Sequence, residues 1–248
     1  MSTVARVCVL GPSGRMGKAL LDAARDRADL RVSSTADQGD ELAPAFAACD
    51  VYIDFTTPDS TRAAAELAAA RGVPAVIGTT GLGADAARAI ATLAEHAPVI
   101  VSANFSLGVN LLLGLARTAS HALGPEWDAE VVETHHKLKR DAPSGTALAI
   151  ARAIAAGRGV DYDTVKRHAR DGDIGPRPAG EIGVSSVRGG DVIGEHVAYF
   201  FTGAERIELA HRATSRSIFA VGALRAAAWL VGKPPGSYTM QSVLGFEP

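Results

Sequence analysis

The chain has 248 residues and a formal net charge of -2, with 25 Lys and Arg residues against 27 Asp and Glu residues. This balance offers no basic patch for nucleic acid and no polybasic cluster for a membrane surface, so neither partner is expected. Hydrophobic residues make up 47% and charged residues 21%, the composition of a folded globular protein. Because no apolar run reaches the length of a signal-peptide core or a spanning helix, we expect a cytoplasmic protein.

The first hundred residues alternate short β-branched apolar runs with Ala-rich stretches, a pattern typical of βα units and a parallel sheet. Strands are expected over residues 4–10, 31–35, 51–54, 74–77 and 99–102. Each run is almost continuously apolar, as expected for strands that helices cover on both faces. Between the third and fourth strands, Thr57 as N-cap, Pro58 in the first turn and a closing Gly72 predict a helix. The pattern predicts a Rossmann-type, doubly wound α/β sheet in this half.

The pattern changes after Asn104, where longer helices and alternating strands follow. Helices are expected over residues 106–122, 144–156 and 217–231. Strands are expected over residues 129–135, 182–188, 191–201 and 205–212. The stretch over residues 157–180 is rich in Gly, Arg and Asp, which is typical of an exposed loop. The last helix is apolar enough to return and pack on the first half.

A glycine-rich loop follows the first strand directly and opens a helix. Gly11, Gly14 and Gly17 form a GxxGxxG pattern in place of the commoner GxGxxG spacing. Such glycines let the backbone approach a pyrophosphate, and the helix N-terminus supplies oriented N–H groups. Asp37 lies 20 residues beyond Gly17, where a carboxylate accepts a hydrogen bond from a ribose 2′-hydroxyl. Together these features predict a nicotinamide dinucleotide site.

The residues after the second strand also bear on the choice of cofactor. The Asp37 carboxylate repels a 2′-phosphate, and Gln38 stands where an Arg would pair with one. We therefore expect NADH to be used at least as well as NADPH, with Arg15 able to supply part of the missing charge. Two further small, polar loops, residues 78–81 and 102–105, follow the fourth and fifth strands, where open α/β sheets bind ligands. They suit backbone contacts to a cofactor, and plain turn chemistry is the alternative.

The segment over residues 133–146 is the most unusual in the chain. It combines the pair His135 and His136, two of the five Lys residues, and a helix start of the form Asp-Ala-Pro-Ser-Gly-Thr. Adjacent strand residues point to opposite faces, and no third ligand follows at a zinc spacing. The histidine pair therefore does not predict a metal site.

The same segment has the features of an anion pocket. Ser144 is expected to cap the helix, and the N–H groups of Gly145 and Thr146 lie at its positive end. Lys139 adds a full positive charge. These groups together predict a site for a substrate carboxylate.

These motifs resemble those of the 4-hydroxy-tetrahydrodipicolinate reductase (dihydrodipicolinate reductase) family of lysine and diaminopimelate biosynthesis. The shared features are the Gly11 loop, the Gly-Thr-Thr-Gly turn at residues 78–81, the run Ala-Asn-Phe-Ser-Leu-Gly-Val-Asn over residues 103–110, and the His-His-x-x-Lys-x-Asp-Ala-Pro-Ser-Gly-Thr segment over residues 135–146. The last of these is highly specific, and the similarity extends over essentially the full chain.

The resemblance implies two domains and an assembly. A dinucleotide-binding domain is expected over residues 1–106 and 216–248, and an α+β domain with a mixed sheet, for substrate binding and oligomerisation, over residues 107–215. The family implies a homotetramer that reduces a cyclic unsaturated dicarboxylate with NADH or NADPH and needs no metal.

The resemblance also implies roles for individual residues. His135 matches the catalytic histidine and Lys139 the proton donor of the family. Positions that hold the substrate carboxylates match His136, Ser144, Gly145 and Thr146. The cofactor positions match Gly11, Pro12, Ser13, Gly14, Arg15, Met16, Asp37, Gly78, Thr79, Thr80, Ser102, Ala103, Asn104 and Phe105.

The expected chemistry agrees with these residues. Hydride transfer to a conjugated imine or enamine leaves negative charge at the other end, which needs a positioned acid. Lys139 is the expected donor, with His135 as a second acid or an electrostatic partner. One alternative is another NAD(P)-dependent enzyme such as an aspartate dehydrogenase, which the Lys139 to Thr146 segment disfavours. The other is a catalytically silent dinucleotide sensor, which the presence of both His135 and Lys139 disfavours.

Overall fold

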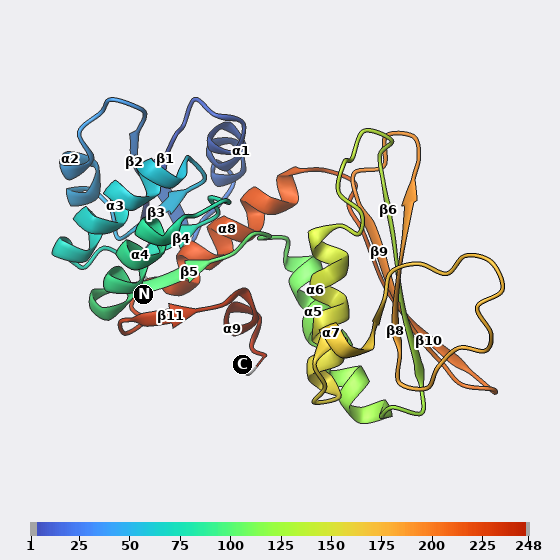
Figure 1. Ribbon diagram of the computed structural model, residues 1–248. Coiled ribbons are helices and arrows are strands. Elements are labelled where there is room, and N and C mark those ends of the chain that lie inside the picture. The colour runs from blue at the N-terminus through green and yellow to red at the C-terminus, as the bar shows by residue number, and fades with distance from the viewer. Residues whose placement is uncertain (1–3, 247–248) are drawn as a thin grey trace. The chain divides into compact units, whose positions relative to one another are not determined.

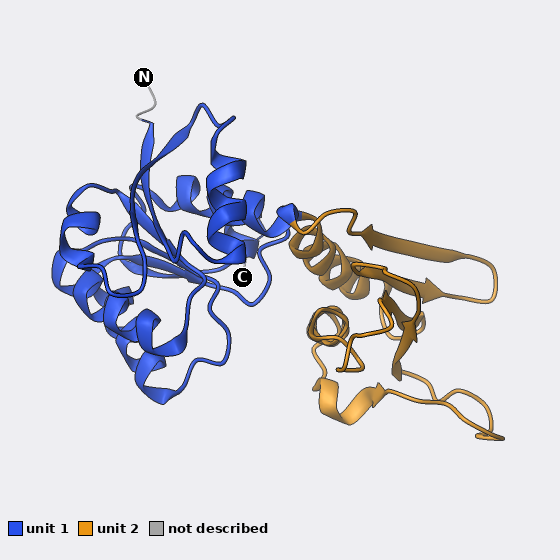
Figure 2. Ribbon diagram, turned by 90° about the horizontal axis from the view of Figure 1, so that it is seen from above, with its two compact units in different colours: residues 1–107, 217–248 blue, residues 108–216 orange. Residues whose placement is uncertain are grey.

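The computed structural model describes residues 4–246 and divides the chain into two compact units (Figures 1 and 2). Unit 1 comprises Met1–Leu107 and Ser217–Pro248, and unit 2 comprises Gly108–Arg216. The boundaries lie one residue from those expected from the sequence. Within residues 4–246, no helix combines the length and apolar character of a membrane span.

In the described part of the chain, unit 1 contains one sheet of six strands. The strands are β1 (Ala5–Leu10), β2 (Leu30–Ala36), β3 (Val51–Asp54), β4 (Ala75–Ile77), β5 (Pro98–Val101) and β11 (Gly236–Tyr238). Their order is β11-β5-β4-β3-β1-β2, and every neighbouring pair is parallel. The expected doubly wound parallel sheet is confirmed, with each of its five expected strands shifted by at most one residue. Strand β11, from the C-terminal segment, was not expected.

Helices cover both faces of this sheet. They are α1 (Arg15–Ala24), α2 (Leu42–Ala47), α3 (Pro58–Arg71), α4 (Ala84–His96), α8 (Ser217–Leu230) and α9 (Met240–Leu244). Because side chains alternate along β1, Val7 and Val9 lie in the core with α1 and α8, while Cys8 and Leu10 lie in the core with α3 and α4. The sheet is therefore buried on both sides, which accounts for its continuous apolar strands.

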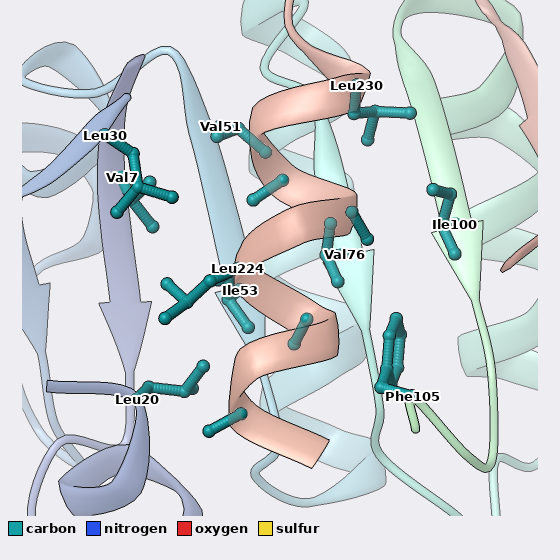
Figure 3. Close-up of a cluster of buried hydrophobic side chains, with 14 of the residues drawn as sticks. Val7, Leu20, Leu30, Val51, Ile53, Val76, Ile100, Phe105, Leu224 and Leu230 are labelled. Atoms are coloured by element: carbon teal, nitrogen blue, oxygen red, sulfur yellow. The ribbon is translucent and has the colours of Figure 1, made fainter. Parts of the chain in front are cut away.

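The expected helix signals are present in the structure. Helix α3 starts at Thr57, whose hydroxyl oxygen accepts from the Ser60 N–H, and ends at Gly72 with a φ of 65°. The returning helix α8 packs its Leu224 and Leu230 against the strands of unit 1 (Figure 3). A Cβ on Gly222 of α8 would lie 1.7 Å from the Phe105 carbonyl oxygen, so the close approach of this helix requires glycine.

Unit 2 contains a mixed sheet of five strands in the described part of the chain. The strands are β6 (Asp128–His135), β7 (Lys166–Arg167), β8 (Ile182–Arg188), β9 (Glu195–Phe201) and β10 (Arg206–Arg212), and the helices are α5 (Leu107–Leu123), α6 (Gly145–Gly157) and α7 (Tyr162–Val165). The strand order is β10-β9-β6-β8-β7, with β7, β8 and β6 parallel and β9 and β10 antiparallel to their neighbours.

Two expectations for unit 2 were wrong in part. Residues 191–194 form a loop before β9 rather than its first four residues, and the Gly194 carbonyl in this loop accepts from the Ala213 N–H at 2.9 Å. The stretch over residues 157–180 contains the short helix α7 and strand β7. Helix α7 forms because Asp161 caps it and Tyr162 is buried against the core of unit 2.

Candidate active site

The glycine loop of unit 1 closes tightly onto helix α1. Gly11 has a φ of 65°, and the Gly14 N–H donates to the Gly11 carbonyl at 3.1 Å. A Cβ on Gly17 would lie 2.1 Å from the same carbonyl oxygen, so only glycine allows the helix to start this close to the loop. The N-terminus of α1 therefore lies at the carboxyl end of β1, which is where a dinucleotide pyrophosphate binds in such folds.

A cavity of about 410 Å³ lies beside this loop. Its lining includes Gly11 after β1, Asp37 after β2 and Thr56 after β3. Strands β2 and β3 lie on opposite sides of β1, so the cavity lies at the topological switch point of the sheet. Ligands bind at this point in open α/β sheets.

The cavity lining is acidic in the region expected to hold a ribose. The Asp37 carboxylate accepts from the N–H groups of Ser13 at 3.3 Å and Gln38 at 2.9 Å. Hydrogen bonds from Ser13 and Gln38 lower the pKa of Asp37, so the carboxylate is ionised and ready to accept from a hydroxyl. Asp40 is the second carboxylate of the lining, which includes no Lys or Arg among the described residues; Arg15 lies outside it.

The loop after β4 rests on a buried polar network. Asp54 is fully buried, and its carboxylate accepts from the hydroxyls of Thr61 at 2.7 Å and Thr79 at 3.3 Å. The Thr79 side chain thus points inward, and the neighbouring Thr80 is exposed. A Cβ on Gly78 would lie 2.0 Å from the Phe55 ring, which explains the glycine. The Thr79 side chain is therefore occupied by Asp54 and does not point toward a ligand in the loop.

The loop after β5 is fixed by its own side chains. The Ser102 hydroxyl donates to the Asn104 carbonyl at 2.9 Å and accepts from the Asn104 N–H at 3.2 Å. Phe105 is 1% exposed and packs edge-on against Phe55, with the ring centroids 5.4 Å apart. Its side chain belongs to the core of unit 1, whereas Ala103 is exposed.

In unit 2, one face of the sheet changes from apolar to polar along its strands. On β6, Ala129 and Val131 are buried in the core, and Glu133 and His135 continue on the same face because side chains alternate. On β9, the buried His196 lies opposite Glu133. Helix α6 contacts β6, β8 and β9, so its first turn lies over these titratable groups.

Glu133 is at the centre of this polar cluster and has no exposed surface. Both of its oxygens accept from Arg188, each at 2.8 Å, and it also accepts from the Ser144 N–H at 3.1 Å and from His135 Nδ1 at 2.5 Å. Burial raises the pKa of Glu133, but hydrogen bonds from Arg188, Ser186 and His135 outweigh it and lower the pKa to about 2. The site therefore contains a fixed, buried carboxylate.

The two buried histidines of the cluster lie edge to face. Their ring centroids are 5.1 Å apart, and His196 Nε2 lies 3.2 Å from the Ser144 hydroxyl oxygen, which also caps α6 through the Ala147 N–H. Burial lowers the pKa of His135, and burial together with the nearby His135 lowers the pKa of His196 to about 4. Both imidazoles are therefore neutral at pH 7.

The loop between β6 and α6 holds the cationic side chain. Lys139 Nζ lies 2.8 Å from Asp141 Oδ1, and Arg188 donates to the Asp141 carbonyl at 2.7 Å. The half-buried His136 is fixed through its N–H, which donates to the Val192 carbonyl at 2.7 Å. The structure thus places His135, His136, Lys139, Ser144, Gly145 and Thr146 in unit 2. Glu133 joins His135 to Ser144 at the start of α6, and Lys139 is close enough to His135 to lower the pKa of that ring.

The sequence interpretation gave no role to four residues of this cluster: Glu133, Arg188, Gly194 and His196. A signal for Glu133 and His196 was present, because both occupy the inward-facing register of an alternating strand. Arg188 lies 55 positions from Glu133, and nothing local connects the two. A Cβ on Gly194 would lie 3.0 Å from His135 Nε2, a contact that only the fold reveals.

Two family models match nearly the whole chain. The model of the dihydrodipicolinate reductase N-terminus matches residues 5–105, and that of its C-terminus matches residues 108–244. The chain belongs to the dihydrodipicolinate reductase family. The resemblance expected from the motifs is confirmed.

Curated relatives agree with this assignment, and a solved structure shares the fold. The 4-hydroxy-tetrahydrodipicolinate reductases of Akkermansia muciniphila and Caulobacter vibrioides are 47% and 46% identical, and the matches cover 97% and 100% of this chain and 98% and 100% of the relatives. The dipicolinate-bound dihydrodipicolinate reductase of Paenisporosarcina sp. TG-14 has the same fold, with a TM-score of 0.76, 24% identity, and 96% of this chain and 98% of that chain covered.

Proposed function

We propose that the chain catalyses the NADH- or NADPH-dependent reduction of 4-hydroxy-tetrahydrodipicolinate to tetrahydrodipicolinate, a step of diaminopimelate and lysine biosynthesis. The observation that carries this proposal is the match of both family models across residues 5–105 and 108–244. The polar cluster at the N-terminus of α6 supports it independently, because a helix N-terminus beside a cation suits a small dicarboxylate.

The residues of unit 1 fit a nicotinamide dinucleotide. Gly17 packs closely against the Gly11 carbonyl, and because neither glycine has a side chain, a pyrophosphate can approach the loop backbone. Asp37 is an ionised acceptor for a ribose hydroxyl. When bound, the nicotinamide supplies the hydride. Asp37 and Asp40 in the cavity lining favour NADH, because a 2′-phosphate would meet two carboxylates there.

Unit 2 binds and protonates the substrate. Ser144, Gly145 and Thr146 hold a carboxylate at the first turn of α6, and His136 assists. Lys139 gives a proton from Nζ to the substrate atom that receives the electron pair, becomes a neutral amine, and is reprotonated from solvent. Arg188 and Glu133 remain ionised throughout, so the site keeps its fixed charges during the reaction.

The family resemblance also supports a homotetramer formed through the sheet of unit 2. The face of this sheet opposite α6 presents apolar side chains, among them Val187, which is 47% exposed, and the stacked rings of Tyr199 and Phe201. A partner sheet that covered these groups would gain hydrophobic burial.

The test is a steady-state assay of reduced-cofactor oxidation with freshly made product of dihydrodipicolinate synthase as substrate. We expect turnover with both cofactors and a kcat/KM with NADH at least equal to that with NADPH. If neither NADH nor NADPH supports turnover, the proposed function is refuted. A large preference for NADPH would refute the role of Asp37. Oxaloacetate with ammonium is the control substrate for an aspartate dehydrogenase, and no turnover is expected with it.

A matched pair of variants separates the charge of Asp37 from general effects on the cavity. Asp37→Asn removes the carboxylate that contacts the Ser13 N–H, and it should raise the NADPH to NADH ratio of kcat/KM about tenfold, since 1.4 kcal/mol of lost repulsion corresponds to a factor of ten. Gly83→Ala, which lies outside the cavity lining and meets no atom within 4 Å, should leave the ratio unchanged.

A further inference from the structure

The carboxylate of Glu133 is saturated with hydrogen bonds. An ionised carboxylate has about four lone-pair sites, and four contacts occupy them: two from Arg188, one from the Ser144 N–H and one from His135 Nδ1. The side chain of Ser186 on β8 adds to the hydrogen bonds that lower the pKa of this carboxylate. The fork-shaped contact with Arg188 fixes the plane of the carboxylate, because both oxygens are held at 2.8 Å. Glu133 therefore cannot rotate without breaking several contacts at once.

This saturation determines the proton position on His135. Glu133 is ionised and has no proton to give, so the hydrogen between it and His135 must lie on Nδ1. The neutral imidazole then carries a lone pair on Nε2. His135 consequently acts as a hydrogen-bond acceptor at Nε2 and not as the second acid that the sequence left open.

The space at Nε2 is kept open by a glycine. A Cβ on Gly194 would lie 3.0 Å from His135 Nε2 and 3.7 Å from His196 Cε1. The charged and titratable groups that face His135 are Glu133 on its own strand, Arg188 on β8, His196 on β9 and Lys139 on the loop before α6. Of these groups, within residues 4–246, only Glu133 lies within hydrogen-bond distance of Nδ1.

Arg188 connects the same carboxylate to the lysine loop. Besides Glu133, its guanidinium donates to the Asp141 carbonyl at 2.7 Å, and the Asp141 carboxylate accepts from Lys139. A single Arg side chain thus links the strand that carries His135 to the loop that carries Lys139. A Lys at this position could not make the three contacts in their present geometry, because an ammonium lacks the planar fork.

We propose that Glu133 and Arg188 are positioning residues of the reductase site: Arg188 clamps Glu133, and Glu133 holds His135 in the Nδ1–H tautomer so that Nε2 accepts a hydrogen bond during the reaction. The proposal rests on the proposed function for its kinetic consequences. The tautomer of His135 is a property of the free protein and can be measured without any activity.

The first experiment is ¹⁵N NMR of the imidazole nitrogens in the full-length protein at pH 7, with the His135 signals assigned by their loss in His135→Gln. In the wild type we expect a neutral ring with the proton on Nδ1. In Glu133→Gln we expect a mixture of tautomers and a downward shift in the pKa of His135, because the lost carboxylate is the group that raises it. A wild-type ring protonated on Nε2 alone would overturn the proposal.

The second experiment is kinetic. Glu133→Gln should lower kcat about 10²-fold, within the range that general acid–base groups contribute, while the KM for NADH and the inhibition constant of dipicolinate stay within about threefold. Arg188→Lys should give a smaller loss in the same direction. A Glu133→Gln variant with wild-type kcat would refute the positioning role. If the wild type itself shows no reductase activity, the proposed function fails, and the NMR result still decides the Glu133–His135 contact.

The chain contains a matched control pair on the opposite face of the same sheet. Glu130 on β6 also accepts from both terminal nitrogens of one arginine, Arg170, at 2.9 and 2.7 Å. Glu130→Gln and Arg170→Lys alter a comparable ion pair on the face that we assign to subunit contacts. Where size-exclusion chromatography shows the oligomeric state of the wild type, both variants should leave kcat and the His135 tautomer unchanged. Thermal unfolding and NADH binding, which belongs to unit 1, verify that every variant is folded. Equal losses of kcat in Glu130→Gln and Glu133→Gln would indicate a purely structural effect and refute the proposal.

Discussion

Lys139 is the residue that we propose as the proton donor of the cluster. Burial lowers the pKa of His135 and that of His196, the latter to about 4, so both rings are neutral. Arg188 cannot deprotonate, because its guanidinium is further stabilised by Glu133. These properties support the Lys139 ammonium as the proposed general acid, and its contact with Asp141 orients it.

Lys139→Ala should lower kcat by about 10²-fold or more, because a positioned general acid contributes about 10²- to 10⁴-fold. Lys139→Arg should not restore the rate, since it keeps the charge but has no proton to give near neutral pH. Steady-state kinetics with saturating NADH measures both. The control is Lys137→Ala, an exposed neighbour two positions away, which should behave like the wild type. Restoration of kcat by arginine would contradict proton donation and leave an electrostatic role alone.

At the scale of helices and strands, some features could be predicted from neighbouring residues in the sequence, and others depend on distant contacts. The Thr57 cap and Gly72 end of α3 are local signals, and both were confirmed. Strand β11 was missed because three residues, Gly236–Tyr238, carry no alternation and are held only by pairing with β5. The inward direction of the Thr79 and Phe105 side chains was also missed, because it depends on residues that are distant in the sequence. Thr79 contacts Asp54, and Phe105 packs against Phe55. Motif residues can be located from sequence, but whether a side chain or only its backbone faces the ligand depends on tertiary contacts.

The turn between β1 and α1 offers a test at this scale. Gly17→Ala places a Cβ 2.1 Å from the Gly11 carbonyl oxygen, a backbone atom that cannot move without shifting the loop. We expect a loss of about 3 kcal/mol in the free energy of unfolding and weaker NADH binding, since overpacking of this kind costs about 1–3 kcal/mol or more. Urea unfolding followed by circular dichroism measures the first, and cofactor fluorescence the second.

Gly83→Ala is the control for that substitution. Gly83 is also in unit 1 and precedes a helix, but its added Cβ would meet no atom within 4 Å, so we expect a change below about 1 kcal/mol. If the two alanine variants have the same stability and NADH affinity, the close contact at Gly17 is not what fixes the loop.

For the whole molecule, the two units differ in their buried histidines. Burial is the main reason that the pKa of three histidines is lowered, and all three lie in unit 2: His135, His196 and His211. The described histidine of unit 1, His96, is exposed. A histidine with a folded pKa below its unfolded value of about 6.5 binds its proton more readily in the unfolded chain, so stability falls as pH drops from about 6.5 toward the folded pKa. Glu133, with a pKa of about 2, adds a further loss only below its usual value of 4.5.

We therefore expect acid to destabilise unit 2 selectively between pH 7 and pH 5. For His196, a folded pKa of about 4 corresponds to about 2 kcal/mol lost at pH 5. The two Trp residues report on the units separately, because Trp127 packs on the core of unit 2 and Trp229 on that of unit 1. In urea titrations of Trp229→Phe, the Trp127 midpoint should fall between pH 7 and pH 5, while in Trp127→Phe the Trp229 midpoint should stay nearly constant. His196→Gln, which cannot be protonated, should reduce the fall; equal shifts of both reporters would contradict a loss confined to the buried histidines of unit 2.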